Sequence, residues 1–193
     1  MRAAARFALG SDLDGLTVAV QGTGNVGAAL CRMLRAAGAR LVIADVDHRR
    51  VDALVAELGA RAVSVDDILA ADADILAPCA LGGILSARTI PDLKARLVCG
   101  AANNQLATEA DGEALLARGI VYAPDYVVNA GGIINVSAEY LGEAPEAVER
   151  RIGEIAPRLT GILEAAARDN LPANIVADTL ARRIIARGQR AAA

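Results

Sequence analysis

The chain has 193 residues, of which 54% are hydrophobic and 2% aromatic, and its formal net charge at pH 7 is −3. Because charges of both signs are interspersed and tryptophan is absent, neither a basic surface nor a set of stacking aromatic side chains indicates a nucleic-acid-binding protein. No apolar run approaches the roughly 18 residues that a membrane helix needs, and Arg6 interrupts the apolar start, so we expect neither a membrane helix nor a signal peptide.

Strands and helices are predicted to alternate over the first 124 residues, which indicates an α/β protein with a doubly wound, mainly parallel sheet. The chain is expected to start with a short helix from Met1 to Leu9, ended by Gly10, with Arg2 and Arg6 on one face. The elements predicted after it are a strand at 17–21, a helix at 25–37, a strand at 40–45, a helix at 49–58, a strand at 62–63, a short helix from Ser64 to Leu69, a strand at 75–78, a surface helix at 91–96, a strand at 97–100, a helix at 108–118 and a strand at 120–124.

The rest of the chain is predicted to be helical. The expected elements are a helix from Ala130 to Tyr140, one at 146–168 that is kinked by Pro157, one at 175–187, and a frayed tail at 189–193. We therefore predict three parts, namely a linker helix and connector at 1–15, a dinucleotide-binding core at 16–140, and C-terminal helices at 141–193 that pack on or beside the core.

The most informative stretch is a glycine-rich turn between the strand at 17–21 and the helix that follows. This strand–turn–helix context is the one that a dinucleotide-binding fingerprint requires. In it, Gly22 allows the tight turn, Gly24 lets the backbone approach a pyrophosphate, and Gly27 lets the helix pack close to the strand. The N–H groups at the start of the helix would face the phosphates. The alternative is a glycine turn in some other βαβ unit.

A second feature is Asp45, at the end of the next predicted strand and eighteen positions after Gly27. An acid at this place accepts hydrogen bonds from the adenosine ribose and repels a 2′-phosphate, which favours NAD over NADP. The alternative is that Asp45 is a solvated loop acid. Arg49 and Arg50 follow closely, and an arginine there could pair with a 2′-phosphate, so the strictness of the preference stays open.

Small and amide residues follow three successive predicted strands, at 79–83, at 101–105 with Asn103 and Asn104, and at 125–132. Amides both donate and accept hydrogen bonds, which suits a carboxamide or carboxylate ligand. Asparagine and glycine also simply populate turns. Because three such loops follow successive strands, we expect them to line a pocket.

Residue types used in catalysis or metal binding are scarce. Cys31, Cys79 and Cys99 are not spaced as metal ligands, so no metal site is predicted, and Cys31 and Cys99 are expected in the core. A cytoplasmic location is the default for such cysteine usage. The single histidine, His48, lies in a charged loop, and the single lysine, Lys94, is expected to be a solvated surface charge.

Four stretches together resemble the leucine, phenylalanine and valine dehydrogenases of the wider glutamate dehydrogenase-like family. They lie at 17–27, 77–82, 101–105 and 121–135, and the similarity runs from about residue 1 to residue 188. The resemblance implies the nucleotide-binding half of an enzyme that converts an apolar L-amino acid, NAD and water into a 2-oxo acid, ammonia and NADH. It does not define which amino acid is used.

The same resemblance implies roles for individual residues. It assigns the pyrophosphate to Gly22, Thr23, Gly24, Asn25, Val26 and Gly27, the adenosine ribose to Asp45, the adenosine and ribose path to Cys79, Ala80 and Leu81, and the nicotinamide side to Asn103. It places Asn104 near the substrate carboxylate and Gly132, Ile133 and Val136 around an apolar substrate side chain.

The chain departs from the family in its acid–base residues. The family uses a desolvated lysine as the base, with a second lysine and an aspartate, all in an N-terminal domain that these 193 residues lack. Lys94 has no glycine-rich context, so we expect no catalytic residue here and an inactive isolated chain whose partner is the missing half. Both a monomer and a homo-oligomer stay open. The alternatives are a non-catalytic NAD-binding regulatory or sensor module and, less favoured, a Rossmann enzyme for another substrate.

Overall fold

Six parallel strands form one sheet in the order β3-β2-β1-β4-β5-β6 in the computed structural model, which describes residues 1–191. The chain moves outward from β1 to β3, then crosses back to place β4 on the other side of β1. The sheet therefore has a switch point between β1 and β4, as in a doubly wound fold, and the predicted fold class is confirmed. The strands are β1 (Thr17–Gln21), β2 (Arg40–Ala44), β3 (Arg61–Ala62), β4 (Ile75–Pro78), β5 (Leu97–Val98) and β6 (Val121–Tyr122).

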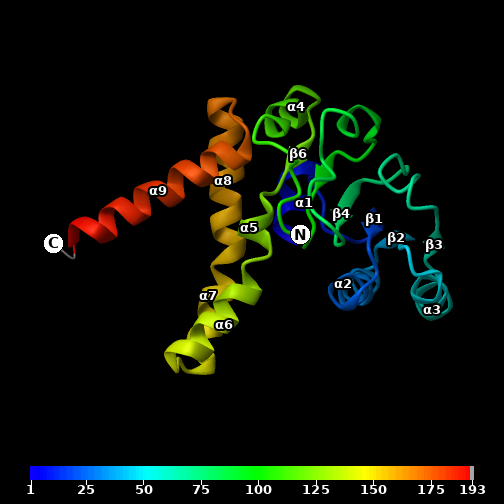
Figure 1. The fold of residues 1–193 in the computed structure, drawn as a ribbon, viewed down its shortest axis with the longest axis horizontal. Helices are drawn as coiled ribbons and strands as arrows, with labels where there is room; N and C mark the ends of the chain where they lie inside the picture. The colour runs from blue at the N-terminus through cyan, green and yellow to red at the C-terminus, as the bar shows by residue number, and fades with distance from the viewer. Residues whose placement is uncertain (192–193) are drawn as a thin grey trace.

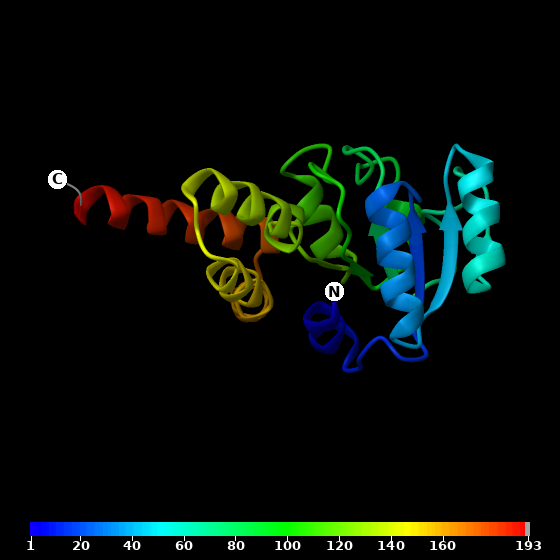
Figure 2. The same ribbon diagram turned by 90° about the horizontal axis from the view of Figure 1, so that it is seen from below.

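Helices connect the strands and continue beyond the sheet. In Figure 1, α2 and α3 lie together beside β1 and β2, whereas α9 extends away from the sheet, an arrangement that Figure 2 also shows. No helix within residues 1–191 is both long and apolar enough to cross a membrane. The helices are α1 (Arg2–Leu9), α2 (Asn25–Ala36), α3 (His48–Leu58), the 3₁₀ turn η1 (Ile90–Asp92), α4 (Asp111–Ala117), α5 (Asp125–Val128), α6 (Gly131–Leu141), α7 (Pro145–Gly153), α8 (Ile155–Asp169) and α9 (Ala173–Ala191).

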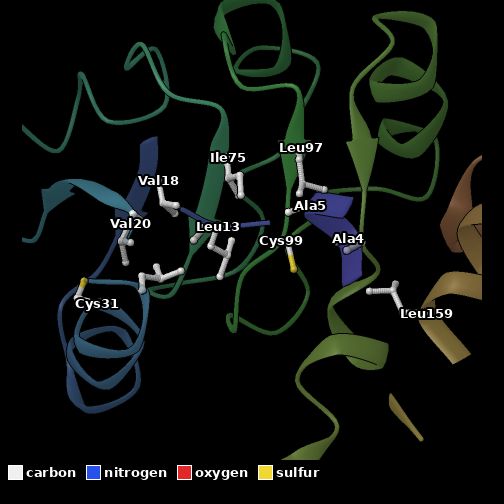
Figure 3. Close-up of a cluster of buried hydrophobic side chains, with 14 of the residues drawn as sticks. Ala4, Ala5, Leu13, Val18, Val20, Cys31, Ile75, Leu97, Cys99 and Leu159 are labelled. Carbon is white, nitrogen blue, oxygen red and sulfur yellow. The ribbon is translucent and has the colours of Figure 1, made fainter. Parts of the chain in front are cut away.

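Both faces of the sheet are covered at its centre, where successive side chains of β1 point to opposite faces and are buried on both. Val18 and Val20 of β1 face a core formed with α1, α2, α3 and α8, and Ala19 faces a second core on the other side. Figure 3 shows the first core, where the β1 side chains lie near Cys31 of α2. The burial of Cys31 and Cys99 that the sequence predicts is confirmed.

The short helix α1 depends on tertiary contacts. Ala4 and Ala5 are fully buried beside α8, and Gly10 ends the helix in the left-handed conformation with φ +67°. On the exposed face, the guanidinium groups of Arg2 and Arg6 both contact the Asp12 carboxylate, at 3.0 and 2.7 Å. The hydrogen bond from Arg6 is the largest cause that lowers the pKa of Asp12 to about 2. A helix this short is marginal alone, and these contacts hold it in place.

Two predicted helices are wrong. The segment after Ser64 has a contact typical of a helix start, because the Asp67 N–H donates to Ser64 Oγ at 3.1 Å. Its backbone N–H groups, however, donate to carbonyl oxygens three residues earlier, so the segment forms successive turns and not an α-helix. The single kinked helix at 146–168 is two helices, α7 and α8, that meet at Glu154. Pro157 has no N–H to donate to Gly153, so it fits only within the first turn of a new helix.

Other boundaries also differ from the prediction. The helix expected at 108–118 begins at Asp111, whose carboxylate accepts bonds from the Thr108 N–H and hydroxyl. The surface helix expected at 91–96 is only the turn η1, and the frayed tail is wrong for 189–191, which belong to α9. Residues 192–193 lie outside the described residues. The strands expected at 97–100 and 120–124 are shorter in the structure, where they are β5 and β6. The strand expected at 62–63 is β3, which begins one residue earlier, and α5 was not predicted.

The division of the chain at residues 15 and 140 stays a prediction. In the structure, α8 contributes Leu159, Ile162 and Leu163 to the same core as β1. The C-terminal helices thus share an apolar core with the sheet.

Shortening Leu159 tests this shared core. Leu159 is 2% exposed, so Leu159→Ala should lower the free energy of unfolding by about 2–5 kcal/mol, measured by urea denaturation followed by circular dichroism. Leu180→Ala is the matched control, because Leu180 on α9 is 37% exposed and its loss should cost under about 1 kcal/mol. Equal losses at the two positions would contradict the packing of α8 described above.

Candidate functional site

The carboxyl ends of the parallel strands bring five loops to one edge of the sheet. Open α/β sheets bind their ligands at this edge, next to the switch point. The glycine turn follows β1, Asp45 follows β2, and the loops that begin at Cys79, Cys99 and Ala123 follow β4, β5 and β6. The predicted cofactor-binding residues and Asn104 therefore follow strands that end at the same edge.

The glycine turn fixes the start of α2 against β1. Gly22 has φ +91°, and a Cβ there would lie 2.8 Å from the Ala80 Cβ. A Cβ on Gly27 would overlap the Gly22 carbonyl oxygen, so only glycine allows this close approach. The two glycines thus have the steric roles that the fingerprint assigns to them.

Gly24 leaves the first turn of α2 open. A Cβ on Gly24 would meet only Arg50 Nη1, at 3.6 Å, and no side chain caps the helix. The N–H groups of Asn25, Val26 and Gly27 have no intrahelical partner, because they belong to the first turn. These N–H groups and the positive end of the helix dipole favour an anionic group such as a phosphate.

Asp45 ties the glycine turn to the end of β2. Its Oδ2 accepts bonds from the Thr23 N–H at 2.5 Å and the Thr23 hydroxyl at 3.1 Å, and its Oδ1 accepts one from the Asp47 N–H at 2.9 Å. A carboxylate accepts about four hydrogen bonds, so about one position remains for a ligand. Its contact with a ribose stays a prediction.

The charge of Asp45 is maintained by these contacts. Partial burial acts to raise the pKa of its carboxyl, but bonds from the N–H groups of Asp47 and Thr23, from the Thr23 hydroxyl, and the charge of Arg50 outweigh burial. The pKa of Asp45 is therefore lower than its ordinary value. Asp45 is ionised at neutral pH.

The loop after β4 runs beside the glycine turn. The Cys79 N–H donates to the Gln21 carbonyl at 2.7 Å, and burial raises the pKa of the Cys79 thiol. Ala80 is exposed, and Leu81 is 82% exposed. The Gly83 N–H donates to the Asn104 carbonyl at 2.7 Å, which joins this loop to the one after β5.

Asn103 and Asn104 lie exposed in the loop after β5. The Asn129 Nδ2 donates to Asn103 Oδ1 at 2.7 Å and to the Ala101 carbonyl at 3.3 Å. Because its Oδ1 is engaged, Asn103 presents its Nδ2 as a donor. Asn104 has φ +53°, a left-handed conformation that asparagine tolerates better than most residues.

Two buried polar residues below these asparagines were not singled out from the sequence. The Gln105 N–H donates to Asp125 Oδ2 at 3.1 Å, and the Tyr126 N–H donates to Asp125 Oδ1 at 2.9 Å. The Gln105 side chain donates to the carbonyls of Gly100 and Ala102. Gln105 and Asp125 both lie within the motifs that carry the family resemblance. Their burial and hydrogen bonds in the structure show that they connect the loops after β5 and β6.

The three residues predicted around the substrate side chain, Gly132, Ile133 and Val136, lie on α6, away from these hydrogen bonds. Ile133 is 68% and Val136 is 60% exposed, and Gly132 is also exposed. Within the described residues, a Cβ on Gly132 would have no neighbour within 4 Å. The structure leaves this apolar face uncovered, and its role toward a substrate stays a prediction.

Neither of the remaining candidate acid–base side chains occupies this site. Lys94 is exposed and precedes β5, so it lies at the amino edge of the sheet, opposite the glycine turn. His48, which was predicted in a charged loop, is instead the first residue of α3, and it is exposed. Among residues 1–191 no three His, Cys, Asp or Glu side chains form a group that could hold a metal ion.

An apolar cavity of about 210 Å³ lies in another part of the molecule. Phe7, Tyr122 and Leu163 are among its lining residues, which come from α1, α4, β6, α8, the start of α9 and the loops before β6 and α9, and include no charged side chain. It offers no partner for a phosphate, and the carboxyl edge remains the candidate site.

Comparisons with known proteins agree with this geometry. A profile of the family described as Glutamate/Leucine/Phenylalanine/Valine dehydrogenase matches residues 43–173, and one described as D-isomer specific 2-hydroxyacid dehydrogenase, NAD binding domain, matches residues 2–81. Leucine dehydrogenase of Bacillus subtilis (strain 168) is 47% identical over 191 residues, which are 98% of this chain and 52% of that protein.

Two further relatives extend the comparison. Phenylalanine dehydrogenase of Lysinibacillus sphaericus is 42% identical over 88% of this chain and 46% of its own length. The crystal structure of L-tryptophan dehydrogenase from Nostoc punctiforme has a TM-score of 0.93 and 42% identity, covering 98% of this chain and 57% of that one. The chain thus spans about half the length of the curated relatives it matches.

Adding a methyl group to Gly27 tests the contact that fixes α2. Gly27→Ala should lower the free energy of unfolding by about 1–3 kcal/mol, because the added Cβ must displace backbone at Gly22. Gly161→Ala in α8 is the matched control, since its Cβ has no neighbour within 4 Å and alanine favours a helix by about 0.5–1 kcal/mol. Urea unfolding of both variants measures the difference, and a neutral Gly27→Ala would contradict the contact.

The contacts of Asp45 predict a pH dependence of stability. Folding lowers the pKa of Asp45, so its ionised carboxylate stabilises the folded chain at pH values above the unfolded-state pKa of 3.8. This contribution is lost as the pH falls through the pKa of the folded state. Asp45→Asn should therefore be less stable than the wild-type chain at pH 7, and the difference should shrink as pH falls below 3.8. Urea unfolding at several pH values checks this, and a difference that does not vary with pH would refute it.

Proposed function

The chain belongs to the glutamate, leucine, phenylalanine and valine dehydrogenase family, and on that premise we propose that its carboxyl edge binds NAD for the oxidative deamination of an apolar L-amino acid. The observation that carries the proposal is the uncapped first turn of α2, held by Gly22 and Gly27 beside the ionised Asp45. It combines a phosphate-binding helix end with an acceptor for ribose hydroxyls at the switch point.

The pyrophosphate would be held by the backbone of the glycine turn. The N–H groups of Asn25, Val26 and Gly27 would donate to its oxygens, and Gly24 leaves them accessible. The remaining acceptor position of Asp45 would receive a ribose hydroxyl. Thr23, which is almost fully buried, keeps the Asp45 carboxylate in place.

The nicotinamide end would lie toward the loop after β5. Bound there, the nicotinamide ring supplies the hydride acceptor of the reaction. Asn103 would donate from its Nδ2 to the carboxamide oxygen, because Asn129 already engages its Oδ1. The exposed residues Ala80 and Leu81 and the half-buried Cys79 would line the path of the adenosine and ribose.

The amino-acid substrate would lie between Asn104 and α6. The exposed Asn104 amide would bind the carboxylate, and the exposed face of Gly132, Ile133 and Val136 would contact an apolar side chain. Burial of that face against an aliphatic or aromatic group removes apolar surface from water, at about 25 cal/mol per Å².

The base of the reaction is proposed to come from residues outside this sequence. Deprotonation of the amine and of the carbinolamine requires a base tuned near the working pH, which contributes roughly 100- to 10,000-fold. Lys94 lies at the opposite edge of the sheet, and the family resemblance places two lysines and an aspartate in an N-terminal half. The isolated chain would then bind the nucleotide with little turnover.

Complementation with a lysine-bearing half tests this division of roles. The N-terminal half of Bacillus subtilis leucine dehydrogenase, expressed separately, is titrated into this chain with NAD and leucine, valine or phenylalanine. NADH formation should rise roughly 100-fold or more above the chain alone and should saturate with the added half.

Each half alone serves as a control, and NADH binding to the chain is measured in parallel. NADH binding without activity in every mixture would favour a non-catalytic NAD-binding module. A chain that binds no nicotinamide nucleotide would refute the proposed function itself.

A further inference from the structure

One cation lies over the glycine turn. Arg50 is in the first turn of α3, and its Nη1 comes within 3.6 Å of the position that a Cβ on Gly24 would take. Its Nε lies 3.4 Å from Asp47 Oδ2. The guanidinium thus lies between the open turn at Gly24 and the two acids that follow β2, Asp45 and Asp47.

Arg50 changes the electrostatic balance beside Asp45. An isolated Asp45 would repel a second negative group, which is why an acid at this position favours NAD. Here three protein hydrogen bonds already engage the Asp45 carboxylate, and the positive charge of Arg50 acts on it as well. The repulsion of a 2′-phosphate is therefore partly offset within the chain itself.

We propose that Arg50 pairs with the 2′-phosphate of an adenosine ribose, so that this chain binds NADPH as well as NADH. The inference rests on the proposed function, since it concerns the same nucleotide site. The guanidinium fork matches phosphate oxygens, and its contact with Asp47 holds it near the end of β2, where its charge acts on Asp45. The pyrophosphate has its own donors in the first turn of α2, so Arg50 is left for a further anionic group.

The neighbouring Arg49 provides a matched control. It carries the same charge on the same turn of α3 and also pairs with Asp47, at 3.3 Å. Its side chain is 92% exposed, and none of its atoms lies within 4 Å of the position that a Cβ on Gly24 would take. Loss of Arg49 removes the same charge without removing a group that faces Gly24.

The test compares two nucleotides that differ only in the 2′-phosphate. Dissociation constants for NADH and NADPH are measured by fluorescence titration for the wild-type chain, Arg50→Gln, Arg50→Lys and Arg49→Gln. We expect Arg50→Gln to weaken NADPH binding by about tenfold or more, the size of a lost charge-assisted hydrogen bond, and NADH binding by less than about twofold. Arg50→Lys should retain part of the NADPH affinity, and Arg49→Gln should leave the ratio of the two constants unchanged.

Salt gives a second readout of the same pair. Because exposed charges are screened, NADPH binding to the wild-type chain should weaken more with added salt than NADH binding, and Arg50→Gln should remove that difference. This readout concerns the charge pair directly and does not depend on catalytic activity.

Several outcomes would overturn the inference. An equal loss for both nucleotides in Arg50→Gln would place Arg50 on the pyrophosphate, and equal effects of Arg49→Gln and Arg50→Gln would show a diffuse charge effect. A wild-type chain that binds NADH but not NADPH would contradict the inference while leaving the proposed function intact. A chain that binds neither would contradict both.

Discussion

The close contact between Gly27 and the carbonyl oxygen of Gly22 determines where α2 begins, because a side chain at either position would displace backbone. With the helix held directly against the end of β1, its unpaired N–H groups open onto the carboxyl edge of the sheet. Asp45 then joins the turn to β2 through Thr23. The phosphate-binding and ribose-binding groups of the proposed site are therefore placed by sterics and by one ionised carboxylate.

Hydrogen bonds also connect each of the other loops at this edge to its neighbour. The loop after β4 bonds to Asn104, Asn103 bonds to Asn129 of the last loop, and the buried Asp125 holds Gln105 beneath them. Buried polar groups are costly unless they are paired, so these contacts favour one arrangement of the loops. The site residues are thereby positioned before any ligand binds.

Features that depend on local sequence were predicted well. The glycine turn, the parallel alternation and the need of α1 for a partner follow from spacing, periodicity and length. The break at Glu154 was missed because periodicity continues through it, while the lost hydrogen bond depends on where Pro157 falls within a turn. The roles of Asp125 and Arg50 depend on what lies across the loops in space. Sequence can name the arginines after β2, but only the fold distinguishes Arg50 from Arg49.

A nicotinamide nucleotide is proposed to bind at the carboxyl edge of the sheet. The most direct test is a titration of the ¹⁵N-labelled chain with NADH, followed by amide chemical shifts. The largest shifts should fall on Gly24 and Val26 of the glycine turn, on Asp45 and on Asn103. Shifts confined to the residues around the apolar cavity of Tyr122, or spread evenly over the chain, would contradict it.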